Sequence, residues 1–303
     1  MSDLKVKMYS DPNREWRPNL APLVEQGFRE NNCQIVDDLK EASFLFARDP
    51  NGYEQMFLDA KEYQKTSILN ILDIPDPQTA EKWRKYINAA SAITAISNTT
   101  ANDVNKYYGI DPFVIYEVVK PMINLNLEMP IRYKDNLRFL YNGRISDNKR
   151  RGLAVELVKN FFEERQLVTV GVDFDDFGKY AGVVEDSWLN YYYNLCNYVL
   201  VPSSFGGIEL PIIQALILGK FPLVCNDCLC AMEFAPEFSA PPNVTGLYNK
   251  IEEIEENLDK YTEIAQDYQK KYKEQFSGKS VCEGIIHTYE RALEQEKECN
   301  YGN

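Results

Sequence analysis

The chain has 303 residues, with 33 Lys and Arg against 46 Asp and Glu, which gives a formal net charge of −13. This length is enough for two ordinary domains, and a composition of 45% hydrophobic and 26% charged residues is typical of a packed globular protein. The acidic balance excludes nonspecific coating of nucleic acid or of anionic membranes, although a local basic patch can still bind phosphate.

The first half of the chain alternates short apolar runs with helical patterns, which is typical of a parallel sheet covered by helices. The predicted strands are residues 5–9, 34–36, 43–47, 66–72, 93–97 and 114–119, and the predicted helices are residues 20–30 and 80–90. The stretch that follows Lys120 and Pro121 contains a second proline and no helical period. We therefore expect a linker there.

The same alternation starts again after the linker. The predicted strands are residues 136–141, 167–172, 198–201 and 221–225, and the predicted helices are residues 153–162, 188–195 and 210–218. An apolar stripe from 250 to 276 and a last helix at about 281–294 complete the chain.

Two successive α/β units predict an α/β fold with two Rossmann-like lobes and C-terminal helices. We assign residues 1–120 to an N-terminal acceptor lobe and residues 121–280 to a C-terminal donor lobe, with the donor cleft between them. The C-terminal helix, at about 281–297, can pack back on the first lobe.

Cysteine, histidine and the N-terminus limit the chemistry and the location. Seven cysteines, an odd number, fit reduced thiols better than a disulfide framework. Cys225, Cys228 and Cys230 lie close in sequence, but the only histidine is His287 and no second cysteine pair completes a zinc site, so we expect no metal. No run approaches the roughly 18 apolar residues of a membrane span. We expect a cytoplasmic protein, in the host cytoplasm if it is viral; the oligomeric state stays unknown.

A basic motif lies where a predicted strand ends and a helix begins. Gly143 and Arg144 end the strand, and Lys149, Arg150 and Arg151 open the helix. Backbone amides at a helix start favour an anion, an arginine can make a fork of two hydrogen bonds, and a lysine adds a point charge. The motif therefore suits a diphosphate. The alternative is a solvated helix start, although cations at that end oppose the helix dipole.

A second loop connects the predicted strand 198–201 to the helix 210–218. Paired glycines allow a ligand to approach the backbone closely, and the helix start supplies further amides. The residues expected to bind the donor in this loop and helix are Ser204, Gly206, Gly207, Ile208, Glu209, Leu210 and Gln214. Two such sites in one lobe indicate an anion-binding function more strongly than either alone.

With these motifs the chain resembles the retaining nucleotide-sugar glycosyltransferases of family 4, which have the GT-B fold. Residues 139–144 with Lys149 are similar to the family's G-R-hydrophobic-x3-K signature; residues 193–203, 207–211 and 219–224 to its long donor-lobe motif; and residues 92–97, 108–109 and 114–115 to the end of its N-terminal lobe. The likeness covers most of the second lobe and is faint before residue 90. In the family, the Arg and Lys of the signature hold the donor diphosphate.

The sequence departs from the family pattern at two glutamates separated by seven residues. In register they fall on Gly206 and Gln214, so neither carboxylate is present. By analogy with the second glutamate, Gln214 is expected to bind a ribose hydroxyl. Glu209 occupies a usual glycine position and could reach the region of the first glutamate from the next turn. The N-terminal lobe lacks the family's Gly-rich loop and histidine.

The resemblance implies a retaining hexosyl- or pentosyltransferase that uses a UDP- or GDP-linked sugar as co-substrate, by front-face attack without a covalent enzyme intermediate. Arg144, Lys149 and Glu209 are the expected catalytic residues. No cofactor is expected and the enzyme is metal-independent, because cations and helix amides can neutralise the leaving diphosphate. The acceptor-side candidates, near strand ends of the first lobe, are Asp11, Arg14, Asp73 and Asp76. The last two can equally belong to a Pro-rich turn.

Two alternatives stay open beside transfer to a glycan or a small molecule. A phage-type transferase that adds a sugar to a modified pyrimidine in DNA needs a basic track and extrusion of the base from the duplex. The residues available for that track are Arg14, Arg17, Lys149, Arg150 and Arg151. The missing motif carboxylates also allow a non-catalytic nucleotide-sugar binding protein.

Overall fold

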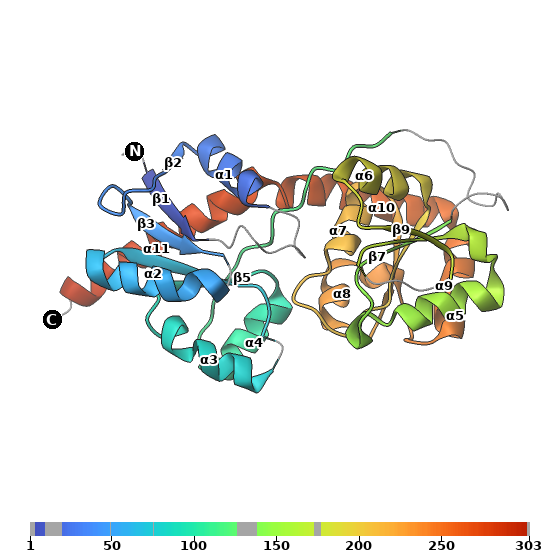
Figure 1. The fold of residues 1–303 in the computed structure, drawn as a ribbon, viewed down its shortest axis with the longest axis horizontal. Helices are drawn as coiled ribbons and strands as arrows, with labels where there is room; N and C mark the ends of the chain where they lie inside the picture. The colour runs from blue at the N-terminus through green and yellow to red at the C-terminus, as the bar shows by residue number, and fades with distance from the viewer. Residues whose placement is uncertain are drawn as a thin grey trace. The chain divides into compact units, whose positions relative to one another are not determined.

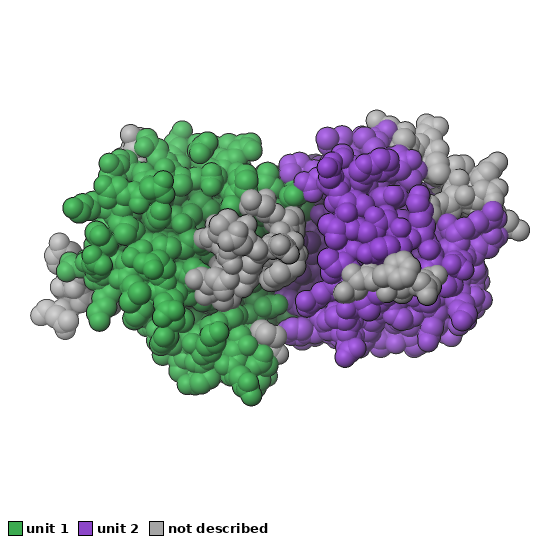
Figure 2. Space-filling view, in the orientation of Figure 1, with its two compact units in different colours: residues 1–120, 274–303 green, residues 121–273 purple. Residues whose placement is uncertain are grey.

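The computed structural model describes residues 4–9, 20–48, 50–74, 76–125, 138–172 and 177–301. The chain divides into two compact units: unit 1 comprises residues 1–120 and 274–303, and unit 2 comprises residues 121–273 (Figure 2). The boundary after residue 273 precedes the expected boundary at residue 280. One reason is that the backbone N–H of Val119 donates to the carbonyl of Phe276 over 3.0 Å, which ties that part of the chain to unit 1.

The sheet of unit 1 is entirely parallel. It consists of β1 (Leu4–Tyr9), β2 (Cys33–Ile35), β3 (Phe44–Ala47), β4 (Thr66–Ile71), β5 (Ala92–Ala95) and β6 (Phe113–Val114), in the order β2-β1-β3-β4-β5-β6. β2 is added on one side of β1 and β3 on the other, so the direction in which the chain adds strands to the sheet reverses between β1 and β3. Ligands of open α/β sheets bind at the carboxyl ends of the strands at such a switch point.

Helices cover both faces of this sheet. On one face α1 (Ala21–Glu30) and α11 (Gly278–Tyr301) pack against each other and on the strands (Figure 1). Phe28, Cys282 and Ile285 belong to the buried cluster on this face. A Cβ added to Gly27 would lie 2.1 Å from the carbonyl oxygen of Gly278, so the two helices approach at glycines. The other face is covered by α2 (Pro50–Tyr63), α3 (Pro77–Ile87) and α4 (Asn98–Tyr108).

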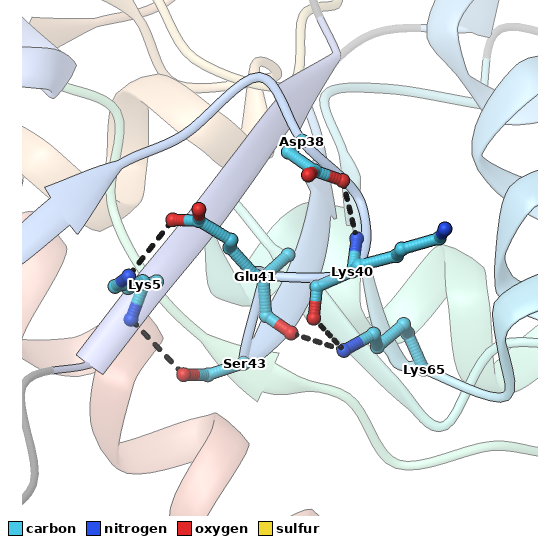
Figure 3. A network of polar contacts seen from close by, with 7 residues as sticks. Lys5, Asp38, Lys40, Glu41, Ser43 and Lys65 are labelled. Atoms are coloured by element: carbon cyan, nitrogen blue, oxygen red, sulfur yellow. Dashed lines mark hydrogen bonds and ion pairs between the residues drawn. The ribbon is translucent and has the colours of Figure 1, made fainter.

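The amino ends of the strands in unit 1 carry a polar network. Lys65 Nζ donates to the carbonyl oxygens of Lys40 and Ala42, over 3.2 and 2.6 Å (Figure 3). Lys65 also lines a cavity of about 390 Å³, together with Ser67, Ser91 and side chains of α2 and α3. Because Ser67 and Ser91 lie at the amino ends of β4 and β5, this cavity is at the sheet edge opposite to the one where ligands of such folds bind.

The sheet of unit 2 is also parallel throughout. It consists of β7 (Phe139–Asn142), β8 (Leu167–Val170), β9 (Lys179–Gly182), β10 (Tyr198–Val201), β11 (Phe221–Cys225) and β12 (Ser239–Ala240), in the order β12-β11-β10-β7-β8-β9. The first strand lies between the second and the fourth, as in the Rossmann fold, and the order reverses between β7 and β10. The carboxyl ends of those two strands define the expected ligand site.

The helices of unit 2 are α5 (Arg151–Phe161), α6 (Asp186–Leu195), α7 (Leu210–Ile217), α8 (Leu229–Phe234), α9 (Val244–Glu256) and α10 (Leu258–Gln275), with 3-10 turns η1 (Asp147–Lys149), η2 (Glu164–Gln166) and η3 (Pro236–Phe238). The apolar stripe predicted from 250 to 276 is divided between α9 and α10. Asn257 separates them, and its side chain donates to the carbonyl of Glu253 over 2.9 Å. None of the described helices combines the length and the apolar character needed to cross a bilayer.

Candidate functional site

The two predicted donor loops meet at the switch point of unit 2. The loop after β7 contains Asn148, and the loop after β10 contains Ser204 and Phe205. The backbone N–H of Ser204 donates to the carbonyl of Asn148 over 2.8 Å, and the Asn148 amide donates to the carbonyl of Phe205 over 3.3 Å. These bonds join the two loops, so the two motifs belong to one site. The backbone N–H of Ser204, one of the expected donor-binding residues, is thus used to hold the two loops together.

Lys149 and Glu209 form an ion pair within this site. Lys149 ends η1, Glu209 directly precedes α7, and Lys149 Nζ lies 2.5 Å from Glu209 Oε1. The side chain of Glu209 is only 3% exposed. Burial raises the pKa of the Glu209 carboxyl above its ordinary value, against the lowering effects of Lys149, Ser203 and Arg144. An anion that binds Lys149 therefore competes with a buried carboxylate for it.

Because Gly206 has no side chain, the Glu209 carboxylate can occupy the space beside it. A Cβ added to Gly206 would lie 2.5 Å from Glu209 Oε1 and 3.3 Å from its Cδ. Gly206 does not have a positive φ, so the glycine is explained here by space and not by backbone conformation. The remaining expected donor residues of this loop follow the chain into the helix: Gly207 is buried, Ile208 is half-buried and Leu210 is the first residue of α7.

Gln214 lies on α7 and is buried within a hydrogen-bond network. Tyr193 Oη, from α6, donates to Gln214 Oε1 over 2.9 Å. The side-chain amide of Asn142, at the end of β7, donates to Tyr193 Oη over 3.0 Å. Burial raises the pKa of Tyr193, so the phenol stays protonated and remains a donor. Asn142 and Tyr193 position Gln214, and the sequence analysis did not assign them; the strand-end position of Asn142 was the available signal.

The cations of the basic motif have different roles. Arg144 is exposed. Arg150 pairs with Asp227 through two hydrogen bonds of 2.9 and 2.6 Å, and Arg151 is buried and donates to Thr169 over 2.8 Å. Arg151 is buried, so it does not extend the anion-binding patch as expected, whereas Arg150 is half-buried and already paired with Asp227. Arg144 and Lys149 are the members of the motif that can meet a ligand, with Gly143 between them and the end of β7.

The cysteine cluster lies near the site but has the properties of a packed core. Cys225, Cys228 and Cys230 are free and buried, and burial raises the pKa of each thiol, that of Cys225 to about 11. Among the described residues, no group of three or more His, Cys, Asp or Glu side chains could hold a metal ion.

The acceptor-side candidates of unit 1 are only partly described. Asp11 and Arg14 lie outside the described residues. Asp76 caps α3: its carboxylate oxygens accept from the backbone N–H and the hydroxyl of Thr79, over 2.8 and 2.9 Å, and these bonds lower its pKa. Asp76 therefore has at least a structural role, at the start of α3. Asp73 is half-buried just after β4, at the carboxyl edge of the sheet.

A buried ion pair marks the switch point of unit 1, and the sequence analysis did not find it. Arg48 follows β3, and its backbone N–H donates to the carbonyl of Tyr9 at the end of β1 over 3.2 Å. Arg48 Nη2 lies 2.9 Å from Glu117 Oε1, and both side chains are buried. No motif signals this pair, because the two residues are far apart in the sequence and neither belongs to a pattern.

Comparison with known proteins rests on structure, since no family model and no curated protein sequence matches the chain. HepE from Anabaena, solved in complex with UDP and glucose, superposes with a TM-score of 0.75 over 95% of this chain and 100% of its own, at 13% identity. For sucrose-phosphate synthase from Thermosynechococcus elongatus the TM-score is 0.70 over 96% and 100%, at 13% identity. For the lipopolysaccharide outer core galactosyltransferase WaaB it is 0.66 over 97% and 99%, at 15% identity. These neighbours are GT-B glycosyltransferases, and the likeness shows that this chain has the GT-B fold.

Proposed function

We propose that the protein is a retaining glycosyltransferase that moves a sugar from a nucleoside-diphosphate donor, UDP- or GDP-linked, to a glycan or small-molecule acceptor. The observation that carries the proposal is the junction of the loops after β7 and β10, at the switch point of a Rossmann-ordered sheet. Lys149 belongs to the first loop, and Gln214 belongs to the helix that follows the second. A structural neighbour, HepE, was solved with UDP-glucose, which supports a UDP-linked donor.

Each residue has a role in this proposal. Lys149 provides a point charge for the diphosphate, and the exposed Arg144 provides a planar fork for its oxygens. Gln214 meets a ribose hydroxyl. When the bond to the sugar breaks, negative charge grows on the leaving diphosphate, and cations already in place stabilise it. The proposal therefore requires neither a metal ion nor a cofactor, and the acceptor attacks on the face that the diphosphate leaves.

The proposal includes a cytoplasmic location. The six cysteines whose surroundings are described are all free and buried. Disulfides form and persist in oxidising compartments, so these free thiols are consistent with a reducing compartment such as the cytoplasm.

The test combines binding with turnover. Isothermal titration with UDP, GDP, UDP-glucose, UDP-galactose, UDP-N-acetylglucosamine and GDP-mannose identifies the donor, and release of the nucleoside diphosphate, with and without EDTA, measures turnover. Binding with turnover in EDTA supports the proposal. Binding of a sugar nucleotide without turnover, with a panel of acceptors, favours the non-catalytic binding protein. Absence of binding to every nucleotide contradicts both.

The DNA alternative loses support from the basic motif. It needs Arg150 and Arg151 as part of a cationic track, but Arg150 is paired with Asp227 and Arg151 is buried. Phosphate contacts supply much of the affinity of proteins for nucleic acid; Arg151 is buried and cannot make them, and Arg150 would have to leave Asp227 to do so.

A further inference from the structure

Positions 206 and 209 compete for one space in the donor site. Glu209 Oε1 lies 2.5 Å from the point where a Cβ on residue 206 would be, which is closer than a carbon and an oxygen that are not bonded can approach. A side chain at 206 and the observed position of Glu209 therefore exclude each other. The carboxylate in this space comes from residue 209, and a side chain at 206 would require the end of the Glu209 side chain to move.

The surroundings of Glu209 suit a group that binds ligand. The carboxylate is buried, held by Lys149 through Oε1, and located where the two donor loops are joined. An ionised carboxylate can accept about four hydrogen bonds, and in a site of low dielectric those bonds are strong. Burial raises the pKa of Glu209 because it disfavours the ionised carboxylate. Hydrogen bonds donated by a ligand therefore stabilise the ionised form.

From this geometry we infer that Glu209 is the residue that recognises the sugar of the donor: its carboxylate accepts hydrogen bonds from sugar hydroxyls, from the place that a side chain at residue 206 would otherwise fill. The inference rests on the proposed function and names a specificity-determining residue within it. The same carboxylate competes with the diphosphate for Lys149, so the free site holds the Lys149–Glu209 pair closed. When a sugar nucleotide binds, the diphosphate takes over Lys149 and the sugar hydroxyls take over Glu209.

This double role predicts two effects of opposite sign. Glu209→Gln and Glu209→Ala remove the competitor for Lys149, so UDP alone binds at least about threefold more tightly, as expected when a like charge leaves an anion site. The same variants lose the charge-assisted bonds to the sugar. The ratio of the UDP-sugar affinity to the UDP affinity therefore falls by about tenfold or more. If Glu209 has only a structural role, its substitution weakens the binding of UDP and of the UDP-sugar by the same factor.

A positional swap tests the exclusion directly. Gly206→Glu alone forces the Glu209 carboxylate out of its observed position and brings a second negative charge close to it, so donor binding and the melting temperature both fall. Glu209→Gly alone removes the carboxylate and lowers the affinity ratio. The double variant Gly206→Glu with Glu209→Gly returns one carboxylate to the space, and we expect it to recover most of the ratio. Glu237→Gln, which changes an exposed carboxylate of η3 and the net charge by the same amount, is the control.

The measurements are titration calorimetry and thermal unfolding of the full chain and all variants with UDP and with the sugar nucleotide that the wild-type protein prefers. Tighter UDP binding with a reduced ratio in Glu209→Gln, together with recovery in the swap, supports the inference. If the wild-type protein prefers a sugar nucleotide and Glu209→Gln keeps that preference, Glu209 does not recognise the sugar and the inference is overturned, while the proposed function stands. A wild-type protein that binds no nucleotide overturns both.

Discussion

Tyr193 Oη donates a hydrogen bond of 2.9 Å to the amide oxygen of Gln214, and this bond fixes which end of the amide can meet a ligand. The same oxygen also lies 3.5 Å from the Asn142 amide nitrogen, so the amide nitrogen of Gln214 is the end that is left for a ligand. The Asn142 amide lies 3.0 Å from Tyr193 Oη and supports the same orientation. A glutamine held in this way presents a donor where a glutamate would present an acceptor.

Substitutions of Gln214 test this arrangement. Gln214→Leu removes the ligand contact and leaves Tyr193 without its acceptor, so we expect nucleoside-diphosphate affinity to fall by about 1.5 kcal/mol and the free energy of unfolding by about 1 kcal/mol. Gln214→Glu keeps an acceptor for Tyr193 and a group that can bind a ribose hydroxyl, so activity is retained. Calorimetry with UDP and chemical unfolding measure the two effects. A leucine variant with full donor affinity would remove Gln214 from the site.

Arg144 is predicted to act on binding without acting on stability. Its side chain is exposed, so Arg144→Ala leaves the free energy of unfolding within about 0.5 kcal/mol of wild type. Loss of a charge-assisted hydrogen bond weakens donor binding by roughly 1.5–3 kcal/mol. Arg150→Ala is the matched control, since that guanidinium is engaged by Asp227. Equal losses of affinity in both variants, measured at physiological salt, would mean that only general electrostatics is at work.

Lys149 is predicted to act on both properties, in contrast to Arg144. Lys149→Met weakens donor binding and also leaves the Glu209 carboxylate buried without its partner, which costs about 3 kcal/mol of stability. The double variant Lys149→Met with Glu209→Gln removes the unpaired charge and is expected to recover most of this stability. Urea unfolding of the single and double variants at pH 7 distinguishes them. If the double variant is no more stable than Lys149→Met, the two side chains are not coupled.

The raised pKa of Glu209 makes stability depend on pH with a definite sign. Because burial raises the pKa in the folded chain above its ordinary value of 4.5, the folded chain binds this proton more tightly than the unfolded chain does. The stability that Glu209 contributes is thus fully present below pH 4.5 and is lost as the pH rises through the folded-state pKa. We expect the wild-type protein to lose stability relative to Glu209→Gln over that range. A difference that is constant from pH 4 to pH 8 in urea unfolding would contradict the assignment.

The buried pair of Arg48 and Glu117 is predicted to be stabilising only as a pair. Glu117→Gln leaves the Arg48 guanidinium buried without a counter-ion, which costs about 3 kcal/mol or more. Arg48→Met combined with Glu117→Leu replaces both charges by apolar groups of similar size and is expected to cost less than the single variant. Chemical unfolding at neutral pH provides the comparison. A single variant that is as stable as the double variant would show that the pair contributes nothing.

Long apolar runs predicted the inner strands well, because burial on both faces leaves a continuous signal. β10 (Tyr198–Val201) and β11 (Phe221–Cys225) have their predicted bounds. The edge strand β9 (Lys179–Gly182) was missed, because it is only partly buried and carries little hydrophobic pattern. α4 was also missed, since its sequence is rich in poor helix formers; the Ser97 side chain caps its start and Gly109, with a φ of 70°, ends it.

The candidate site was predictable to the level of the loops but not to the level of individual partners. Residue spacing identified the two motifs, because each depends on a few neighbouring residues. Arg150 and Asp227 are 77 residues apart, and the relation of Gly206 to Glu209 depends on how one turn folds. Neither relation has a counterpart in composition or periodicity, so three-dimensional structure was needed to show which cations of the motif are buried or paired within the protein.

The contact between Gly27 and Gly278 has a consequence for the order in which the chain folds during synthesis. The whole of unit 2, residues 121–273, leaves the ribosome before α11 does, although it follows most of unit 1 in the sequence. Until α11 arrives, the apolar face around Phe44 is therefore covered by α1 alone. We therefore expect unit 2 to complete its folding before unit 1. Until then, the incompletely covered sheet face of unit 1 is exposed to aggregation and to chaperones.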